Sequence, residues 1–239
     1  MITKDDLIAF EKEVAHQFEA GKIHAPIHLG SGNEDQLLEL FKSVSPDDWK
    51  LCTWRNHLHA LLSGIPPDEV MRQILAGKSM SINSVEHRFY SSAIAGGILP
   101  IAVGLGMAIK RFQPSAICGI EDCCHCRCKD LRCTTLLQSN EDGGHLHYQH
   151  YPCPAWSRKV FCFVGDMTAA TGGFEEATKY AWNFRLPVTF IIEDNGKSVQ
   201  TPTKEAWGNP WPYEFRKNVI YYKYELTWPH HGTGIHVAF

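Results

Sequence analysis

The sequence lacks any long apolar stretch, and it carries no strong excess of charge of either sign. A membrane-spanning helix needs about 18 or more consecutive apolar residues, and no such run occurs. The formal net charge is −3 and the isoelectric point is near 6.5, so neither nucleic acid nor an anionic membrane is an expected partner. The first residues, which include Lys4, Asp5 and Asp6, do not form a signal-peptide pattern, so the expected location is the cytoplasm.

The length of 239 residues favours one α/β domain with a sizeable core and is short for two large domains. We therefore expect a single domain over residues 1–239. Cysteine is plentiful rather than scarce, and six of the nine cysteines lie between Cys118 and Cys133. In a reducing compartment such clustering suggests a metal site or free thiols before disulfides.

A strand–helix–strand unit is predicted between Val160 and Asn195. The apolar run Val160–Val164 has no polar alternation, which is typical of a strand buried on both faces of a parallel sheet. A helical segment over about residues 174–184 follows, and a second apolar run, Val188–Ile192, completes the unit. The pattern predicts an α/β fold, a three-layer parallel sheet with helices on both faces, whose ligands bind at the carboxyl ends of the strands.

Polar residues follow both of these strands. Asp166 and Asn195 offer a carboxylate and an amide oxygen, which suit Mg²⁺. Between them a turn with Gly172 and Gly173 opens a helix, whose free N–H groups favour a diphosphate. The alternative is an ordinary βαβ unit in which the aspartate and the asparagine are incidental.

These residues resemble the fingerprint of thiamine diphosphate enzymes. Within that superfamily the chain is most similar to the alpha subunits of 2-oxo acid dehydrogenase complexes, which act on pyruvate, branched-chain 2-oxo acids or acetoin. In place of the family's Gly-Asp-Gly this chain has Gly-Asp-Met, so the side chain of Met167 must fit beside the diphosphate. The matching segments are Gly165-Asp166, Phe174-Glu175-Glu176-Ala177, Leu186-Pro187-Val188 and Glu193-Asp194-Asn195.

The resemblance implies thiamine diphosphate and Mg²⁺ as cofactors, with Mg²⁺ held by Asp166, Asn195 and the backbone carbonyl of Lys197. Arg55 offers a planar fork for phosphate oxygens, although a surface arginine is the alternative. Backbone groups near Ile94 and Ala95 are expected against the aminopyrimidine. The residues expected to bind the cofactor are Trp54, Arg55, Ile94, Ala95, Gly165, Asp166, Met167, Thr168, Asn195, Lys197 and His231.

Two histidines are the candidate catalytic residues. His28 stands where the family has an active-site histidine before a glycine turn, and imidazole titrates near neutrality. Without the resemblance, a lone histidine at such a place is more often structural. His57 ends a Trp54-Arg55-Asn56-His57 segment that resembles the family's Tyr-Arg-x-His, whereas His59 is expected to pack in the core.

Residues 112–158 depart most from the family pattern and are predicted to be a Cys/His-rich insertion. Cys123-x-x-Cys126 has the spacing of a zinc knuckle, so we expect one structural zinc. A thiol-rich loop without metal is the alternative. The other candidate zinc ligands are Cys118, Cys128, Cys133, His145, His147, His150 and Cys153.

The resemblance implies an alpha-like subunit that decarboxylates a 2-oxo acid and transfers the acyl or aldehyde unit. In the superfamily a glutamate of the pyrimidine-binding domain helps to activate the cofactor, and no second domain is recognisable here. A beta-subunit-like partner is therefore expected, in a heterotetramer with the active site at the interface. One alternative is a transketolase-like or other thiamine-dependent carbon–carbon ligase or lyase half. Another is a non-catalytic, zinc-bearing scaffold of the same fold.

Overall fold

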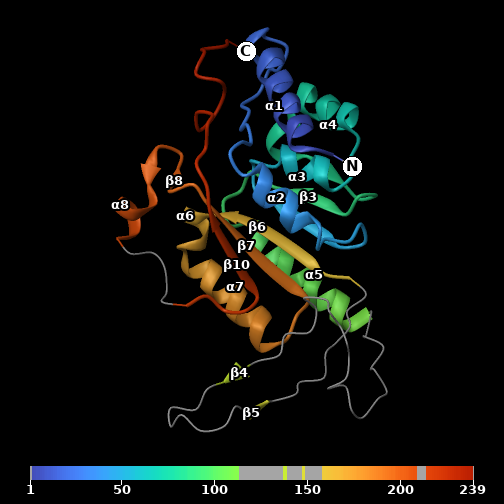
Figure 1. Ribbon diagram of the computed structural model, residues 1–239, viewed down its shortest axis with the longest axis vertical. Coiled ribbons are helices and arrows are strands. Elements are labelled where there is room, and N and C mark those ends of the chain that lie inside the picture. The colour runs from blue at the N-terminus through green and yellow to red at the C-terminus, as the bar shows by residue number, and fades with distance from the viewer. Residues whose placement is uncertain (1, 113–136, 139–146, 149–157, 209–213, 239) are drawn as a thin grey trace.

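A computed structural model of the chain describes residues 2–112, 137–138, 147–148, 158–208 and 214–238. Its centre is a six-stranded sheet in the order β10-β7-β6-β1-β3-β2 (Figure 1). Neighbouring strands are parallel except for β2 against β3. The strands are β1 (Trp49–Cys52), β2 (Asn83–Ser84), β3 (Phe89–Ser91), β6 (Val160–Gly165), β7 (Val188–Asp194) and β10 (Val219–Lys223).

Helices cover both faces of this sheet (Figure 1). On one face lie α1 (Lys4–Glu19), α2 (Glu34–Phe41), α3 (His57–Leu62) and α4 (Pro67–Gln73), and α4 continues through the turns Ile74–Lys78 and Ser79–Ser81. On the other face lie α5 (Ile98–Phe112) and α7 (Gly172–Asn183). Two short helices, α6 (Asp166–Ala169) and α8 (Thr203–Trp207), sit beyond the carboxyl ends of the strands.

The side chains of β6 show why the run is continuously apolar. Phe161 and Phe163 pack into the core formed with α1–α4, whereas Val160, Cys162 and Val164 pack into the core formed with α5 and α7. Because successive residues of a strand point to opposite faces, a strand between two helical layers needs apolar residues at every position. The predicted α/β fold with helices on both faces is confirmed.

Two longer helices, α1 and α5, pack on opposite faces of the sheet. α1 begins with a capping box in which the Thr3 hydroxyl accepts from the Asp6 N–H and the Asp6 carboxylate accepts from the Thr3 N–H. The small residues of α5 let it lie close to the sheet, since a Cβ atom at Gly106 would lie only 2.4 Å from Val188. The short distance excludes any larger residue there without movement of the helix.

The C-terminal segment runs alongside the loop that follows α1 (Figure 1). The Gly232 N–H donates to the Ile27 carbonyl at 2.9 Å, and the Thr227 hydroxyl donates to Ser31 Oγ at 2.7 Å. Gly32 has a φ of +83°, and a Cβ atom there would lie 1.9 Å from the Glu225 carbonyl oxygen. Two segments far apart in sequence are thus held side by side at the carboxyl edge of the sheet.

Most of the predicted insertion lies outside the described residues. Within it, β4 (Leu137–Gln138) pairs antiparallel with β5 (His147–Tyr148). The helices in the described part of the chain include none long and apolar enough to cross a membrane. Two smaller strands, β8 (Lys197–Ser198) and β9 (Thr201–Pro202), form a separate hairpin after β7.

Candidate active site

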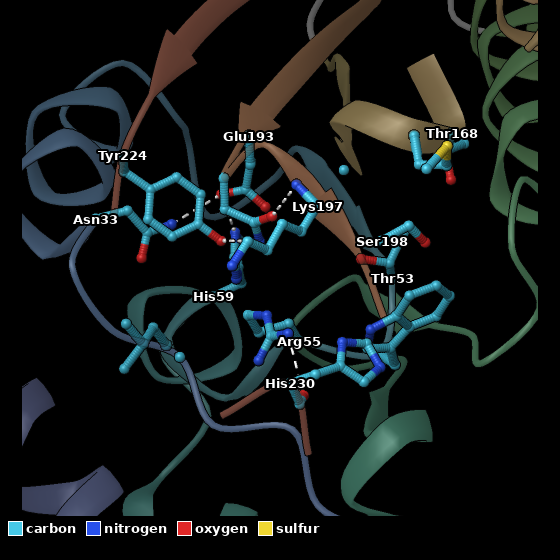
Figure 2. Close-up of a pocket in the computed structure, with 16 residues that line it drawn as sticks. Asn33, Thr53, Arg55, His59, Thr168, Glu193, Lys197, Ser198, Tyr224 and His230 are labelled. Atoms are coloured by element: carbon cyan, nitrogen blue, oxygen red, sulfur yellow. Dashed lines mark hydrogen bonds and ion pairs between the residues drawn. The ribbon is translucent and has the colours of Figure 1, made fainter. Parts of the chain in front are cut away.

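A cavity opens at the carboxyl ends of β1, β6 and β7. The pairing of Gly165 with Glu193 places the residues that follow β6 beside those that follow β7. The residues after β1 lie on the other side of β6 and bring Thr53, Trp54 and Arg55 to the same edge. Figure 2 shows side chains from all these segments converging on the cavity, which is lined by, among others, Thr53, Arg55, Thr168, Glu193, Asn195 and Tyr224.

Asp166 is a buried carboxylate at the start of α6, only 1% exposed. Its Oδ2 atom accepts a hydrogen bond from the Thr203 hydroxyl. Burial, with a smaller contribution from Asp194, raises its pKa to about 6 against the opposing effect of the Thr203 hydrogen bond. None of the described lysines, arginines or histidines forms an ion pair with it. A buried carboxylate in this situation fits a bound divalent cation.

Asn195 is oriented by its neighbours on both sides. Its Oδ1 atom accepts from the Lys197 N–H at 3.1 Å, and its Nδ2 atom donates to the Tyr224 hydroxyl at 3.2 Å. Asp194 steadies the same loop, because it accepts from the Gly196 N–H at 2.7 Å and from the Tyr221 hydroxyl at 2.6 Å. The amide oxygen has a second lone pair, so together with Asp166 it offers the oxygen ligands that Mg²⁺ requires.

Arg55 joins the two segments that flank the cavity. Its guanidinium donates to the Leu29 carbonyl at 2.7 Å and to the His230 carbonyl at 3.3 Å. Burial lowers the pKa of Arg55, while Tyr224, Glu11 and Glu193 act in the opposite direction. It forms no ion pair with any described carboxylate, so a positive charge at the cavity wall lacks a direct anionic partner. A bound phosphate group fits this arrangement.

His28 lies among aromatic rings next to the same wall. Its ring centroid is 4.9 Å from that of His230, 6.0 Å from Trp54 and 6.4 Å from His231. Burial, with smaller contributions from Arg55 and the neighbouring histidines, lowers the pKa of His28 to about 3. The imidazole is therefore neutral in the folded chain. Its Nδ1 atom is buried and has no hydrogen-bond partner among the described residues, and His28 adjoins the cavity without lining it.

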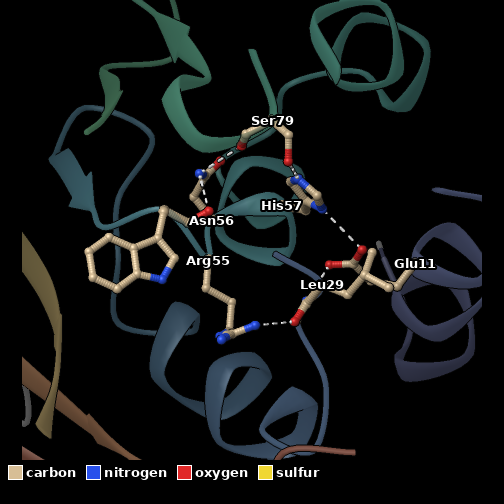
Figure 3. Close-up of polar contacts among 8 residues, drawn as sticks. Glu11, Leu29, Arg55, Asn56, His57 and Ser79 are labelled. Carbon is tan, nitrogen blue, oxygen red and sulfur yellow. Dashed lines mark hydrogen bonds and ion pairs between the residues drawn. The ribbon is translucent and has the colours of Figure 1, made fainter. Parts of the chain in front are cut away.

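His57 lies in a buried polar cluster beside the cavity and does not line it (Figure 3). One ring nitrogen is bonded to Glu11 and the other to Ser79. Neither nitrogen is left for a substrate or a phosphate. The structure thus gives His57 the role of holding Glu11 and Ser79 together.

Several predicted residues lie elsewhere. Ile94 is 70% exposed, and neither Ile94 nor Ala95 lines the cavity, although a Cβ atom at the adjacent Gly96 would lie 3.9 Å from Thr168. His231 lines a neighbouring groove, and it is His230 that reaches the cavity itself. The cavity is lined by seven of the predicted cofactor-binding residues, Trp54, Arg55, Gly165, Met167, Thr168, Asn195 and Lys197. Asp166 does not itself line the cavity and lies buried between Gly165 and Met167. Cofactor binding by these residues stays a prediction.

The zinc prediction rests on residues whose placement the structure leaves out. Cys118, Cys123, Cys126, Cys128, Cys133, His145, His150 and Cys153 all lie outside the described ranges. His147 is in β5, where only the backbone is described. No cluster of three or more potential metal-ligating side chains of the His, Cys, Asp and Glu types occurs within the part of the chain that is described.

Sequence reasoning missed a polar cluster around Glu193. The Glu193 carboxylate lines the cavity and accepts from Asn33 Nδ2 at 3.2 Å and from His59 Nε2 at 3.1 Å (Figure 2). It also accepts from the Tyr222 hydroxyl. His59 also packs edge-on against Phe163, as expected of a core residue. The sequence placed Glu193 in a segment that matches the family fingerprint, after an apolar run, but it did not indicate its partners, which come from the start of α2, from α3 and from β10.

Comparison with known proteins identifies the family. The model of the dehydrogenase E1 component family matches residues 4–214, which is most of the chain. The chain belongs to the dehydrogenase E1 component family. This agrees with the resemblance carried by the Gly165-Asp166 and Glu193-Asp194-Asn195 segments, and it confirms the predicted kinship with 2-oxo acid dehydrogenase alpha subunits.

Three relatives in this E1 family illustrate the extent of the similarity. The pyruvate dehydrogenase E1 component subunit alpha-3, chloroplastic, of Oryza sativa subsp. japonica is 26% identical over 215 residues, covering 86% of this chain and 43% of the relative. The pyruvate dehydrogenase E1 component subunits alpha of Porphyra purpurea and Zymomonas mobilis are 28% and 27% identical, over 78% and 82% of this chain. Each of these two is covered over 47% of its length, so the chain spans about half the length of these relatives.

Proposed function

We propose that this chain is the alpha-like subunit of a two-component, thiamine diphosphate-dependent enzyme that decarboxylates a 2-oxo acid and transfers the resulting acyl or aldehyde unit. The observation that carries the proposal is that Asn195 and Arg55 line one cavity, and that the buried carboxylate Asp166 lies between two further lining residues, Gly165 and Met167. A carboxylate without a cationic partner and an arginine without an anionic one both suit a magnesium diphosphate. The kinship with E1 subunits supports the same cofactor.

The residues of this chain have separate roles in the proposal. Asp166 and Asn195 hold Mg²⁺ through side-chain oxygens, and the backbone carbonyl of Lys197 completes the protein's share of the ligands. Arg55 orients the diphosphate while it keeps the His28 and His230 segments together. When bound, thiamine diphosphate stabilises the carbanion that decarboxylation leaves.

His28 acts as a neutral hydrogen-bonding group in this site. Its pKa of about 3 leaves the ring uncharged near neutral pH, and its Nδ1 atom has no partner among the described residues. A neutral imidazole can donate or accept a hydrogen bond but carries no charge to attract a carboxylate. We therefore assign His28 to the orientation of the substrate or cofactor, and the charge that attracts an anion comes from Arg55.

We propose a beta-subunit-like partner that carries the pyrimidine-binding domain, in a heterotetramer with the active site at the interface. The relatives are named as subunits alpha of an E1 component, and this chain matches about half of each. Ile94 and Ala95 support the same arrangement, because they are exposed and precede Gly96, whose Cβ would lie 3.9 Å from Thr168, so that a second protein could enclose the aminopyrimidine there. Without that partner, the chain is expected to bind the cofactor weakly and to turn over no 2-oxo acid.

Metal-dependent cofactor binding tests the proposal. Calorimetry of the purified chain with thiamine diphosphate should show binding in the presence of Mg²⁺ and none after chelation. Asp166→Ala should abolish this binding, while Glu205→Gln, an exposed change in α8, should leave it unchanged. Equal affinity in Asp166→Ala and wild type would overturn the assignment. If the assignment holds, the next experiment is copurification of the partner. A screen of 2-oxo acids with the pair then identifies the substrate.

A non-catalytic scaffold is the second candidate, and Met167 is the observation that favours it. The residue replaces the second glycine of Gly-Asp-Gly and lines the cavity, where it reduces the room for a diphosphate. Its sulfur accepts from the Trp207 indole N–H at 3.0 Å, which draws the side chain toward α8. A purified chain that fails to bind magnesium and thiamine diphosphate, even with its partner, would favour the scaffold.

A further inference from the structure

The two segments that carry the candidate magnesium ligands meet at Thr203, the first residue of α8. The Thr203 hydroxyl donates to Asp166 Oδ2, and the Thr203 N–H donates to the Gly196 carbonyl at 3.0 Å. Asp166 follows β6, and Gly196 lies between Asn195 and Lys197 after β7. One residue thus contacts both halves of the site.

Burial and the preceding hairpin hold Thr203 in place. It is only 3% exposed, and the β8–β9 hairpin, in which Lys197 pairs with Pro202, leads the chain back over Gly196. Trp207, at the other end of α8, donates from its indole N–H to the sulfur of Met167 at 3.0 Å. Both ends of α8 therefore contact the Asp166-Met167 dipeptide.

The hydrogen bond from Thr203 restricts how the Asp166 carboxylate can turn. A hydroxyl donor fixes one carboxylate oxygen, and the remaining lone pairs stay available to a metal ion. At the same time the Thr203 N–H donates to the Gly196 carbonyl. This hydrogen bond fixes the backbone of the loop between Asn195 and Lys197, and therefore the placement of the Asn195 side chain and the Lys197 carbonyl. Removal of a residue that hydrogen-bonds to a metal ligand commonly lowers the affinity for the metal by about 10- to 100-fold.

We propose that Thr203 is a positioning residue for the magnesium site: its hydroxyl orients Asp166, and its backbone N–H sets the loop that carries Asn195 and Lys197. This inference rests on the proposed function, since it assumes that Asp166 and Asn195 bind the metal of a diphosphate cofactor. Thr203 itself contacts neither substrate nor cofactor in this assignment.

Two substitutions at Thr203 separate the hydroxyl from the rest of the side chain. Thr203→Val keeps the shape and removes the donor, whereas Thr203→Ser keeps the donor. Mn²⁺, followed by its paramagnetic signal, serves as the metal probe in the full chain with saturating thiamine diphosphate. We expect Thr203→Val to weaken metal binding by about 10- to 100-fold and Thr203→Ser to restore it to within about threefold of wild type. Thr201→Val, an exposed change two residues earlier, is the matched control and should have no effect.

The outcomes separate this inference from the proposed function. If wild type binds the metal with thiamine diphosphate but Thr203→Val binds equally well, the positioning role is wrong and the proposed function stands. If wild type binds neither the metal nor thiamine diphosphate, the positioning role and the proposed function are both overturned. If the valine variant does not fold, Thr203→Ala compared with Thr203→Ser gives the same test.

Discussion

The Nδ1 atom of His57 lies 3.0 Å from Glu11 Oε2, and the Nε2 atom of the same ring lies 2.8 Å from the Ser79 hydroxyl (Figure 3). The other oxygen of Glu11 accepts from the Gly30 N–H at 2.8 Å. Gly30 adjoins Leu29, whose carbonyl accepts from Arg55. A carboxylate of α1 thus fixes both α3 and the loop that carries His28, and it does so from within the core.

We expect Glu11→Ala to destabilise the protein strongly. The change leaves the Nδ1 atom of His57 and the Gly30 N–H without these partners in a buried site, and each buried polar group left unsatisfied costs about 1–3 kcal/mol. Urea unfolding at neutral pH measures this loss. Glu13→Ala, an exposed change two residues later on α1, should alter the free energy of unfolding by less than about 0.5 kcal/mol. Equal stability of the two variants would show that the cluster has no structural role.

The buried imidazole of His28 should make stability depend on pH. Its pKa is about 3 in the folded chain and 6.5 without perturbation, so the unfolded chain takes up a proton below about pH 6.5 and the folded chain does not. The stability of the metal-free protein should therefore fall as the pH drops from about 6.5 toward 3.

His28→Gln tests this effect. The variant should lose less stability than wild type between about pH 7 and about pH 4.5, by about 2 kcal/mol after allowance for partial screening by solvent. Urea unfolding at the two pH values provides the comparison. Parallel losses in both proteins would mean that His28 is not kept neutral by the fold.

Arg55→Lys should weaken diphosphate binding even though it keeps the positive charge. A lysine cannot donate in parallel to the Leu29 and His230 carbonyls, so both the fork and the link between the two segments are lost. We expect thiamine diphosphate with Mg²⁺ to bind at least about tenfold more weakly, a loss of about 1.4 kcal/mol. Calorimetry measures the affinity, and Arg72→Lys, an exposed change on α4, is the control. Unchanged affinity in Arg55→Lys would exclude a role for the guanidinium geometry.

The carboxylate of Asp166 should give the protein's stability a pH dependence opposite to that from His28. Its folded pKa of about 6 lies above the ordinary 3.8, so the folded chain binds the extra proton between these values. The stability of metal-free wild type should fall as the pH rises from about 4 to about 6. Asp166→Asn removes this dependence and should be about 2 kcal/mol more stable relative to wild type at pH 7 than at pH 4, with solvent screening allowed for. A constant difference across this range, in urea unfolding, would contradict the raised pKa.

The zinc site in residues 112–158 stays a prediction. Cys123 and Cys126, with two further ligands from the same segment, should hold about one zinc per chain in a closed, four-coordinate site. Elemental analysis of purified protein measures the metal content, and a Cys123→Ser/Cys126→Ser double variant should lose it. Cys52 and Cys162, both buried in the core, are far less suited to a metal, and Cys162→Ala is the control for nonspecific thiol binding. Wild-type protein without zinc would leave a thiol-rich loop as the better interpretation.

The sequence by itself determined the layers of the fold and the two strand ends that carry the site. The apolar run Val160–Val164 requires a strand buried on both faces, because every second side chain meets a different helical layer. The polar residues Asp166 and Asn195 follow their strands directly, so the parallel order of β6 and β7 brings them to one edge. Such local signals are sufficient because consecutive residues show where each strand begins and ends, and therefore in which direction it runs.

Only the tertiary structure decided which side chains complete the site. Thr203 reaches Asp166 from the far side of a hairpin, Glu193 receives donors from α2, α3 and β10, and His230 rather than His231 lines the cavity. The tertiary structure also placed both ring nitrogens of His57 against Glu11 and Ser79, which no spacing in the sequence indicates. The physical reason is that a hydrogen bond between side chains forms only when the donor–acceptor distance is right to within a few tenths of an ångström. Such distances are set by the packing of whole helices and loops, and not by the residues' own neighbours along the chain.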